Sequence, residues 1–464
     1  MKQFAVIKSF ILFVICLGSA SVHANVHEFR LENGLKILVK EDHRAPVVVT
    51  QVWYKVGSSY EPEGITGISH ALEHMMFKGT DKYPAGEFSR IISANGGSDN
   101  AFTGQDYTTY FQTLEKSRLP ISLELEADRM RGLLLLPEEF EKEIQVIKEE
   151  RRWRTEDKPQ SYTYEVAMAT AFQVSPYRQP IVGWMHDLEN MKVNDLREWY
   201  KQWYAPNNAT VVIVGDVDPT EVYELVKKYF GEIEPSEKIV QKERAEVKQH
   251  GIKRVTVKRP AELPYLMMAY KTPTFRTTMF DQEIPEWEPY ALEVLTGILD
   301  GGKSARFESR LVRGKEIAAS VGASYSLISR LDELLTISGT PANGKTIKQL
   351  EDAIRAEINT LKANLVSEDE LERIKTQVVA NDVYEKDSMF YQGMVIGTLE
   401  TVGIPWQYAD EYVDRVKAVT AEQVQAVAKK YLVDDGLTVA VLDPQPLDKT
   451  QAPRPAGGDE RFVH

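Results

Sequence analysis

One segment occurs twice in this 464-residue chain, and the repeat constrains the fold more than any other feature. Residues 191–219 and 416–444 each run through a helical pattern and a tyrosine into an apolar stretch that ends in Asp-Pro. The copies lie about 226 residues apart, close to half of the chain, which is typical of a duplicated domain. We predict an α+β protein with two homologous halves, each an α/β sandwich in which helices cover a mixed sheet.

Length and composition agree with a globular protein of several domains. Hydrophobic residues make up 43% of the chain and charged residues 27%, which is a core-forming composition. Lys plus Arg number 56 and Asp plus Glu 69, so the formal net charge is −13. Because nucleic-acid binding needs a basic surface, nucleic acid is a poor candidate partner.

The N-terminus has the parts of a secretory signal. Two lysines flank the start of a short apolar run at residues 10–17, and Val22-His23-Ala24 is typical of a cleavage site. A membrane anchor is the alternative, but the run is short for a span that needs about 20 apolar residues. We therefore expect residues 1–24 to be a signal peptide and the chain to be exported, with a periplasm as the favoured compartment and no stable membrane insertion.

The only cysteine, Cys16, lies within this predicted signal. The rest of the chain therefore offers no disulfide, no thiolate nucleophile and no cysteine ligand for an iron–sulfur cluster or a structural zinc. Any metal must be held by histidine, aspartate or glutamate.

Composition also divides the chain into segments. Residues 233–251 are charged and lack apolar periodicity, so we interpret them as a linker between a catalytic half at 25–232 and a non-catalytic half at 252–444. Residues 445–464 are rich in proline, glycine and charge, and we expect them to form a flexible tail.

Local patterns predict the main elements. Alternating residues on both sides of Asn33-Gly34 indicate a β-hairpin. The second half is expected to repeat the order of elements in the first. We expect strands at 47–56, 209–214, near Val255 and near Leu266, and helices at 68–77, 119–154 with a break near Pro137, 219–230 and near Leu292.

The segment His70-Ala71-Leu72-Glu73-His74 lies within the helix predicted at 68–77. Residues at i, i+3 and i+4 share one helix face, so both imidazoles and the carboxylate point to one side. Two neutral imidazoles at this spacing can bind one zinc ion, and Glu73 can reach the water on that metal. This is the inverted zinc motif H-x-x-E-H. Two histidines on an ordinary helix are the alternative, but a chance match is expected only on the order of 0.01 times in a chain with eight histidines.

A catalytic zinc site usually has three protein ligands, so a third ligand is expected on another element. The charged helix at 140–152 offers several acids, most of which we interpret as a solvated face. Glu143 and Glu150 lie seven residues apart, on the face that also carries apolar residues, whereas Glu149 points elsewhere. Periodicity therefore favours Glu150 or Glu143 as the ligand without separating the two.

This motif and spacing resemble the insulinase/pitrilysin zinc peptidases, and most closely the short two-domain bacterial members related to the mitochondrial processing peptidases. In that family a glutamate about 75 residues downstream is the third ligand, and another seven positions before it assists catalysis. Glu150 follows His74 by 150 − 74 = 76 residues and follows Glu143 by 150 − 143 = 7. The resemblance implies that Glu150 binds one Zn²⁺ per chain and that Glu143 is an accessory acid.

The resemblance covers the chain apart from its leader and tail. Residues 96–103 are similar to the family's substrate-binding edge strand, in which Asn100 and Ala101 would bind peptide backbone. No histidine occurs between Gly251 and Val463, so the second half cannot repeat the zinc site. By resemblance it forms a wall or lid, and the two halves are expected to be arranged as a clamshell.

One departure from the family pattern bears on partners. Single-chain active relatives place an arginine, and about seven residues later a tyrosine, in the second half near the zinc. Arg313 matches the arginine, but Ala319 or Ser320 stands at the tyrosine position, and Tyr325 is too far along. The chain thus resembles the zinc-bearing subunit of two-subunit members. We expect a homologous zinc-less partner, with a homodimer as the alternative.

Residues 297–304 formally match the phosphate-binding pattern G-x-x-x-x-G-K-[ST]. That motif requires a strand before the loop, whereas residues 290–299 have the periodicity of a helix. We therefore expect no nucleotide binding. By resemblance this is a glycine-containing loop near the substrate entrance, with Lys303 as a surface cation.

Together these features predict an exported zinc-dependent endopeptidase that hydrolyses peptides or unfolded segments in an enclosed chamber. Zinc would polarise the scissile carbonyl, and Glu73 would take the proton of the zinc-bound water as general base. Substrate would bind in extended form as an added strand. The alternatives are a non-catalytic scaffold or peptide-binding subunit of the same fold, and a zinc-buffering module, which would not need Glu73.

Overall fold

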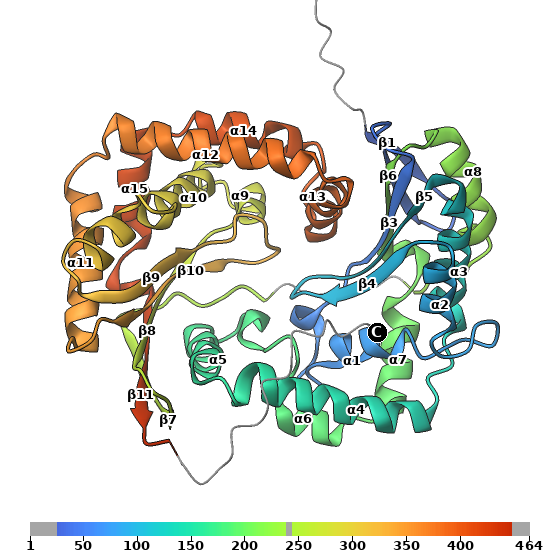
Figure 1. Ribbon diagram of the computed structural model, residues 1–464, viewed down its shortest axis with the longest axis horizontal. Coiled ribbons are helices and arrows are strands. Elements are labelled where there is room, and N and C mark those ends of the chain that lie inside the picture. Colours follow the sequence, from blue (N-terminus) through green and yellow to red (C-terminus); the bar gives the residue numbers. More distant parts are fainter. Residues whose placement is uncertain (1–25, 238–243, 448–464) are drawn as a thin grey trace, which may run out of the picture.

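Two sheets with corresponding strand orders form the framework of the protein (Figure 1), whose computed structural model describes residues 26–237 and 244–447. In spatial order, the first sheet comprises β1 (Val26–Arg30), β2 (Lys36–Glu41), β6 (Ala209–Gly215), β3 (Val47–Tyr54), β5 (Thr108–Glu115) and β4 (Ser98–Thr103). The second comprises β7 (Lys253–Pro260), β11 (Leu437–Gln445), β8 (Tyr265–Thr272), β10 (Glu333–Pro341) and β9 (Ala318–Ser324).

The duplication is visible in how the strands pair. Apart from β1, each sheet begins with a parallel pair, β2–β6 or β7–β11, and continues with antiparallel pairs to an edge strand, β4 or β9. The predicted fold of two homologous α/β halves is confirmed. The predicted signal peptide, the C-terminal part of the predicted tail and residues 238–243 of the predicted linker lie outside the described residues.

Helices cover one face of each sheet, and two large apolar cores lie between these layers. The helices of the first half are α1 (Ile68–Met75), α2 (Glu87–Ala94), α3 (Leu119–Gly132), α4 (Pro137–Arg151), α5 (Pro159–Ala171), α6 (Met185–Asn190), α7 (Val193–Trp203) and α8 (Pro219–Phe230). Those of the second are α9 (Phe275–Phe280), α10 (Trp287–Asp300), α11 (Ile347–Ala363), α12 (Glu368–Lys386), α13 (Met389–Val402), α14 (Tyr408–Lys417) and α15 (Ala421–Tyr431).

Local chemistry accounts for several element boundaries that the sequence predicts. Gly34 has a left-handed φ of 92° in the turn between β1 and β2, which favours a residue without Cβ. Pro137 begins α4 and separates it from α3, because proline is tolerated in the first turn of a helix but not in its interior. Asp218 caps α8 by accepting the backbone N–H groups of Thr220 and Glu221 at 2.8 and 3.0 Å.

Two helices cross from one half to the other. Helix α5 of the first half packs against β11 and β7 of the second, and α13 of the second half packs against β6 and β3 of the first (Figure 1). Each contact buries its own apolar cluster. This exchange covers the sheet faces that the halves' other helices leave bare, and it joins the halves as a clamshell.

The contact of α13 with the first sheet is unusually close because α13 carries two glycines on that face. A Cβ on Gly397 would lie 2.1 Å from Cε2 of the fully buried Trp53, and one on Gly393 would lie 2.9 Å from the side chain of Gln51. Gln51 accepts the indole N–H of Trp53 at 3.0 Å and donates to the Phe390 carbonyl at 3.0 Å. Gly397 is therefore needed for the close approach, whereas the flexible end of the Gln51 side chain could move away from a Cβ on Gly393.

A buried polar cluster also joins the halves. Arg330 of the second half donates from Nε to Asp106 Oδ1 at 3.1 Å and from Nη2 to Ser59 Oγ at 2.8 Å. The hydroxyl of Tyr177 donates to the other oxygen of Asp106. Since all four residues are buried, the charge of Arg330 is satisfied entirely by the first half.

The predicted linker makes one strong anchor. Glu246 accepts the backbone N–H groups of Gln173, Val174 and Ser175 at 2.8 to 3.1 Å, and the Nζ of Lys271 lies 2.7 Å away. Burial opposes ionisation of this carboxyl, but these donors outweigh it and lower the pKa of Glu246 to about 2. The linker therefore ties the end of α5 to β8.

Within the described residues, no helix combines the length and the apolar character that crossing a bilayer requires.

Replacing Gly397 by alanine should destabilise the contact between α13 and the first sheet. Because the new methyl group would overlap the Trp53 ring, we expect a loss of roughly 1–3 kcal/mol in the free energy of unfolding. Gly393→Ala is the matched control, since the flexible side chain of Gln51 can shift away. Calorimetric melting of both variants tests this, and a Gly397→Ala protein as stable as wild type would contradict it.

Candidate metal centre

Helix α1 presents His70, Glu73 and His74 together, and all three side chains are buried. The helix begins after Gly67, whose backbone packs directly on the segment around Gly183. A Cβ at Gly67 would lie 2.3 Å from the Val182 carbonyl oxygen. The H-x-x-E-H residues are thus carried on a helix whose start is held by close backbone packing.

A buried carboxylate caps this helix. Glu61 accepts the backbone N–H groups of Gly67 at 2.7 Å and Ser69 at 2.8 Å. It takes the place of an N-cap side chain, which Gly67 at the N-cap position does not have. Burial raises the pKa of Glu61 to about 8, against these hydrogen bonds, which lower it. The cap fixes the first turn of α1 one residue before His70.

Helix α4 brings Glu150 to the two histidines. Its Oε2 lies 3.6 Å from Nε2 of His70 and 3.4 Å from Nε2 of His74. One ligand atom from each of the three residues lies within 4.8 Å of the others. Ligand atoms bound to a tetrahedral zinc at about 2.0–2.1 Å are roughly 3.3–3.4 Å apart, so the two distances from Glu150 to the imidazoles are close to those that this metal requires.

The electrostatics of this buried cluster favour a cation. Burial disfavours the ionised forms of Glu143 and Glu150, but hydrogen bonds to His74 and nearby positive charges outweigh it and lower both pKa values. The same carboxylates raise the pKa of His74 against the effect of its burial. Since a metal ligand must be a neutral imidazole, a divalent cation would supply the positive charge in place of the proton.

Glu143 faces the opposite side of the His74 ring. Its Oε1 lies 2.8 Å from Nδ1 of His74, and its Oε2 lies 2.6 Å from Nζ of Lys78. This is the arrangement in which a carboxylate holds the second nitrogen of a metal-binding histidine. Glu143 thus contacts the nitrogen of His74 that faces away from Glu150, which is an orienting contact rather than a place among the metal-facing atoms.

Strand β4 provides a hydrogen bond to Glu73. The hydroxyl of Thr103, at the end of β4, donates to Glu73 Oε2 at 2.5 Å. Burial raises the pKa of Glu73 to about 7, although the hydrogen bond from Thr103 and the charge of His74 oppose the rise.

The two predicted peptide-binding residues lie on the edge strand of the first sheet. Asn100 and Ala101 are in β4, which pairs only with β5 in that sheet. The side chain of Asn100 accepts the backbone N–H of Ala101 at 2.8 Å. Among the described residues, β4 is thus the last strand of its sheet, which is where a further strand could be added.

Arg313 lies in the second half at the end of a π-helical segment, η6 (Phe307–Val312). Its side chain is 57% exposed, donates to the Lys303 carbonyl oxygen and approaches Glu308 at 3.5 Å. The structure thus holds Arg313 against its own loop, and its predicted role in substrate binding stays a prediction.

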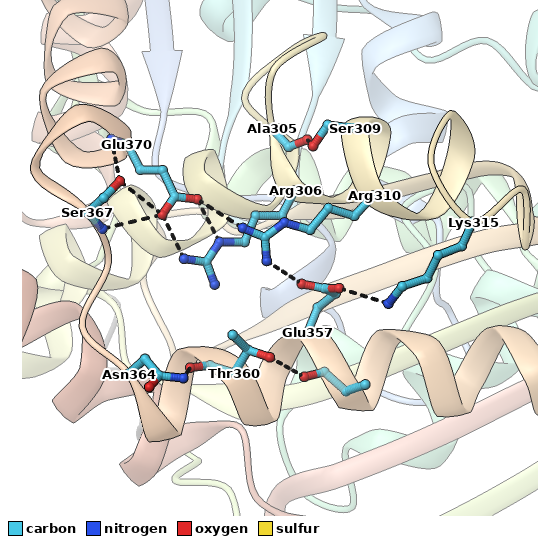
Figure 2. Close-up of polar contacts among 11 residues, drawn as sticks. Ala305, Arg306, Ser309, Arg310, Lys315, Glu357, Thr360, Asn364, Ser367 and Glu370 are labelled. Atoms are coloured by element: carbon cyan, nitrogen blue, oxygen red, sulfur yellow. Dashed lines mark hydrogen bonds and ion pairs between the residues drawn. The ribbon is translucent and has the colours of Figure 1, made fainter.

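Ion pairs fasten the segment before Arg313 to α11 and α12 (Figure 2). Arg306 donates from Nε and Nη2 to the two oxygens of Glu370 at 2.7 and 2.8 Å. Arg310 donates to Glu357 at 2.9 Å, and Figure 2 shows both arginines directed at these acids between the helices. The loop that presents Arg313 is therefore anchored on one side.

The structure also shows where the phosphate-binding pattern and the expected tyrosine position lie. Residues 297–300 form the last turn of α10, so the predicted helix at 290–299 is confirmed, and a helix stands where the phosphate-binding pattern requires a strand. Ala319 and Ser320 lie in the edge strand β9, while the hydroxyl of Tyr325 donates to the Pro273 carbonyl at 2.6 Å.

Sequence reasoning missed four residues that support the site. These are Glu61, Thr103, Lys78 and Arg154, the last of which lies 2.9 Å from Glu150 Oε1. Lys78 and Arg154 follow His74 and Glu150 by four residues, so helical spacing offered a signal for both. Glu61 and Thr103 act from loop and strand, where no periodicity links them to α1.

Comparison with known proteins places this site in a family. The model described as insulinase (peptidase family M16) matches residues 36–183, which include α1, β4 and α4, and the peptidase M16 inactive domain matches residues 190–378. Zinc protease PqqE of Helicobacter pylori is 32% identical over 448 residues, covering 93% of this chain and 97% of that protein. The chain therefore belongs to the insulinase family of peptidases, and this membership supports a zinc metallopeptidase.

Solved structures agree with this assignment. A protease from Helicobacter pylori has a TM-score of 0.85 with 30% identity, covering 91% of this chain and all of that one. The periplasmic protease PqqL from Escherichia coli has a TM-score of 0.73 with 17% identity, a likeness of fold alone. There the match covers 92% of this chain but 49% of PqqL, so PqqL is about twice as long.

Removing the charge of Glu143 should weaken zinc binding. For Glu143→Gln we expect an affinity loss of about 10- to 100-fold, because the His74 ring would lose the carboxylate that orients it. Glu149→Gln on the same helix is the matched control, since that side chain is 64% exposed and pairs with Arg152. Competition with a chromogenic chelator measures both affinities, and equal values would show that Glu143 does not support the metal.

Proposed function

We propose that this chain is a zinc-dependent endopeptidase that hydrolyses peptides or unfolded segments between its two halves. The observation that carries the proposal is the convergence of His70, His74 and Glu150 with Glu73 beside them on the same helix face. A zinc-buffering module would need the first three residues but not a buried fourth acid.

Each residue then has a defined task. Zinc, bound by His70, His74 and Glu150, would supply the Lewis acid that polarises the scissile carbonyl and lowers the pKa of water. Glu73 accepts the proton of the attacking water and delivers it to the leaving amine. Glu143 keeps the His74 ring in orientation through Nδ1.

Substrate would bind as an extended strand along β4. Backbone hydrogen bonds at Asn100 and Ala101 accept any sequence, and the peptide bond to be cleaved would lie near Glu73, which touches the same strand at Thr103. Most strands of a folded protein are already paired within its own sheets, so peptides and unfolded segments are the fitting substrate class. Arg313 is proposed to contact substrate from the second half.

Glu73→Gln should separate metal binding from chemistry. The variant should bind zinc like wild type and lose about 10²- to 10⁴-fold in kcat/KM on a fluorogenic peptide, because the amide cannot accept the proton. Chelation should abolish wild-type activity, and added zinc should restore it. Undiminished turnover by Glu73→Gln would remove this residue as the general base.

We further propose that the chain works with a second, homologous subunit that lacks zinc ligands. The support is the absence of a tyrosine at Ala319 or Ser320, together with the chain matching half the length of PqqL. The homodimer remains the competing arrangement. The short apolar run at residues 10–17 supports export, with a periplasm as the proposed compartment.

The partner proposal predicts low activity of the chain alone. Co-purification from its source should yield a second chain of similar length, and adding it should raise kcat/KM at least about tenfold, since it completes the substrate site. Light scattering would reveal a homodimer instead. Full activity of a monomer would contradict both arrangements.

A further inference from the structure

Thr103 connects two parts of the proposed active site, because it belongs to the edge strand β4 and also contacts the proposed general base. Its hydroxyl donates to Oε2 of Glu73 at 2.5 Å. This contact occupies one carboxylate oxygen and leaves Oε1 for proton transfer. A glutamate side chain has several rotatable bonds, so a fixed oxygen removes much of its freedom to leave a reactive position.

Thr103 is itself held in place. In the β4–β5 pair it lies opposite Thr108, whose hydroxyl is 3.5 Å away and donates to the Val56 carbonyl at 2.9 Å. Gly104 follows, and its backbone N–H donates to the Tyr107 carbonyl at 2.7 Å, which closes the hairpin. Glu73 is therefore tied to a sheet end rather than to a mobile side chain.

The same hairpin is clamped by the second half. Its loop residue Asp106 is buried and accepts hydrogen bonds from Arg330, Ser59 and Tyr177. The turn after Thr103 is thus fixed by contact between the halves. The position of Thr103 depends on both the first sheet and the closed arrangement of the two halves.

We infer that Thr103 is a positioning residue that holds Glu73 for proton transfer and links it to the strand on which substrate binds. The inference rests on the proposed function, because it assigns Glu73 the role of base. Asn100 and Ala101 lie three and two positions before Thr103 in β4. The hydroxyl that orients Glu73 therefore lies on the strand that is proposed to pair with substrate, close to the positions that would bind its backbone.

Removal of the hydroxyl tests the inference. Thr103→Val keeps the shape of the side chain and should lower kcat about 10- to 100-fold while KM changes less than about threefold, because substrate backbone binding is untouched. Thr103→Ser restores the donor and should recover most of kcat. Zinc content should equal that of wild type in both variants.

Thr109→Val is the matched control. Thr109 is buried in the neighbouring strand β5, opposite Phe102, and its hydroxyl has no hydrogen-bond partner among the described residues. The same chemical change there should leave kcat and KM unaltered. If Thr103→Val should unfold, Thr103→Ala removes the same hydroxyl without adding apolar bulk and takes its place.

The outcomes distinguish failure of the proposed function from failure of the role of Thr103 alone. An inactive wild-type protein with zinc and partner bound would overturn the proposed function. An active wild type with Thr103→Val equal to it in kcat, or a rise in KM that accounts for the whole loss, would overturn only the role of Thr103. Failure of Thr103→Ser to recover activity would also overturn it.

Discussion

The contact of α1 with α4, which buries a cluster of ionisable side chains, is the constraint on which the site depends. Glu73, Glu143 and Glu150 lie there with two imidazoles, and burying carboxylates is costly unless positive charge is close. Lys78 and Arg154 supply part of that charge at 2.6 and 2.9 Å. A divalent cation would supply the rest, so metal binding should stabilise this helix pair while it creates the chemistry.

Duplication explains how the second half, in whose described residues no cluster of metal-ligating side chains occurs, still serves the first. The halves share a sheet order, and each lends one helix, α5 or α13, to the sheet face of the other. The contact between the halves also affects the site, since Arg330 holds the hairpin that carries Thr103. The second half thus helps to position the hairpin beside the site. Any surface that it presents to substrate would be a further contribution.

The main elements and the zinc motif were predictable because their signals are local. Alternation around Asn33-Gly34 and the break at Pro137 depend on a few neighbouring residues, and both are observed. The exchange of α5 and α13 was not predictable from periodicity. Each helix has a single charged residue, Glu165 or Glu400, so neither shows a polar face that would reveal which side packs.

The sequence by itself determined that His70, Glu73 and His74 share a face, because a helix repeats about every 3.6 residues whatever surrounds it. It also narrowed the acids of α4 to Glu143 and Glu150. Only the tertiary structure decided that Glu150 meets the Nε2 atoms of both imidazoles while Glu143 meets Nδ1 of His74, because that depends on how α4 crosses α1. Contacts such as Thr103 with Glu73 arise in the same way, from packing between segments that no local pattern relates.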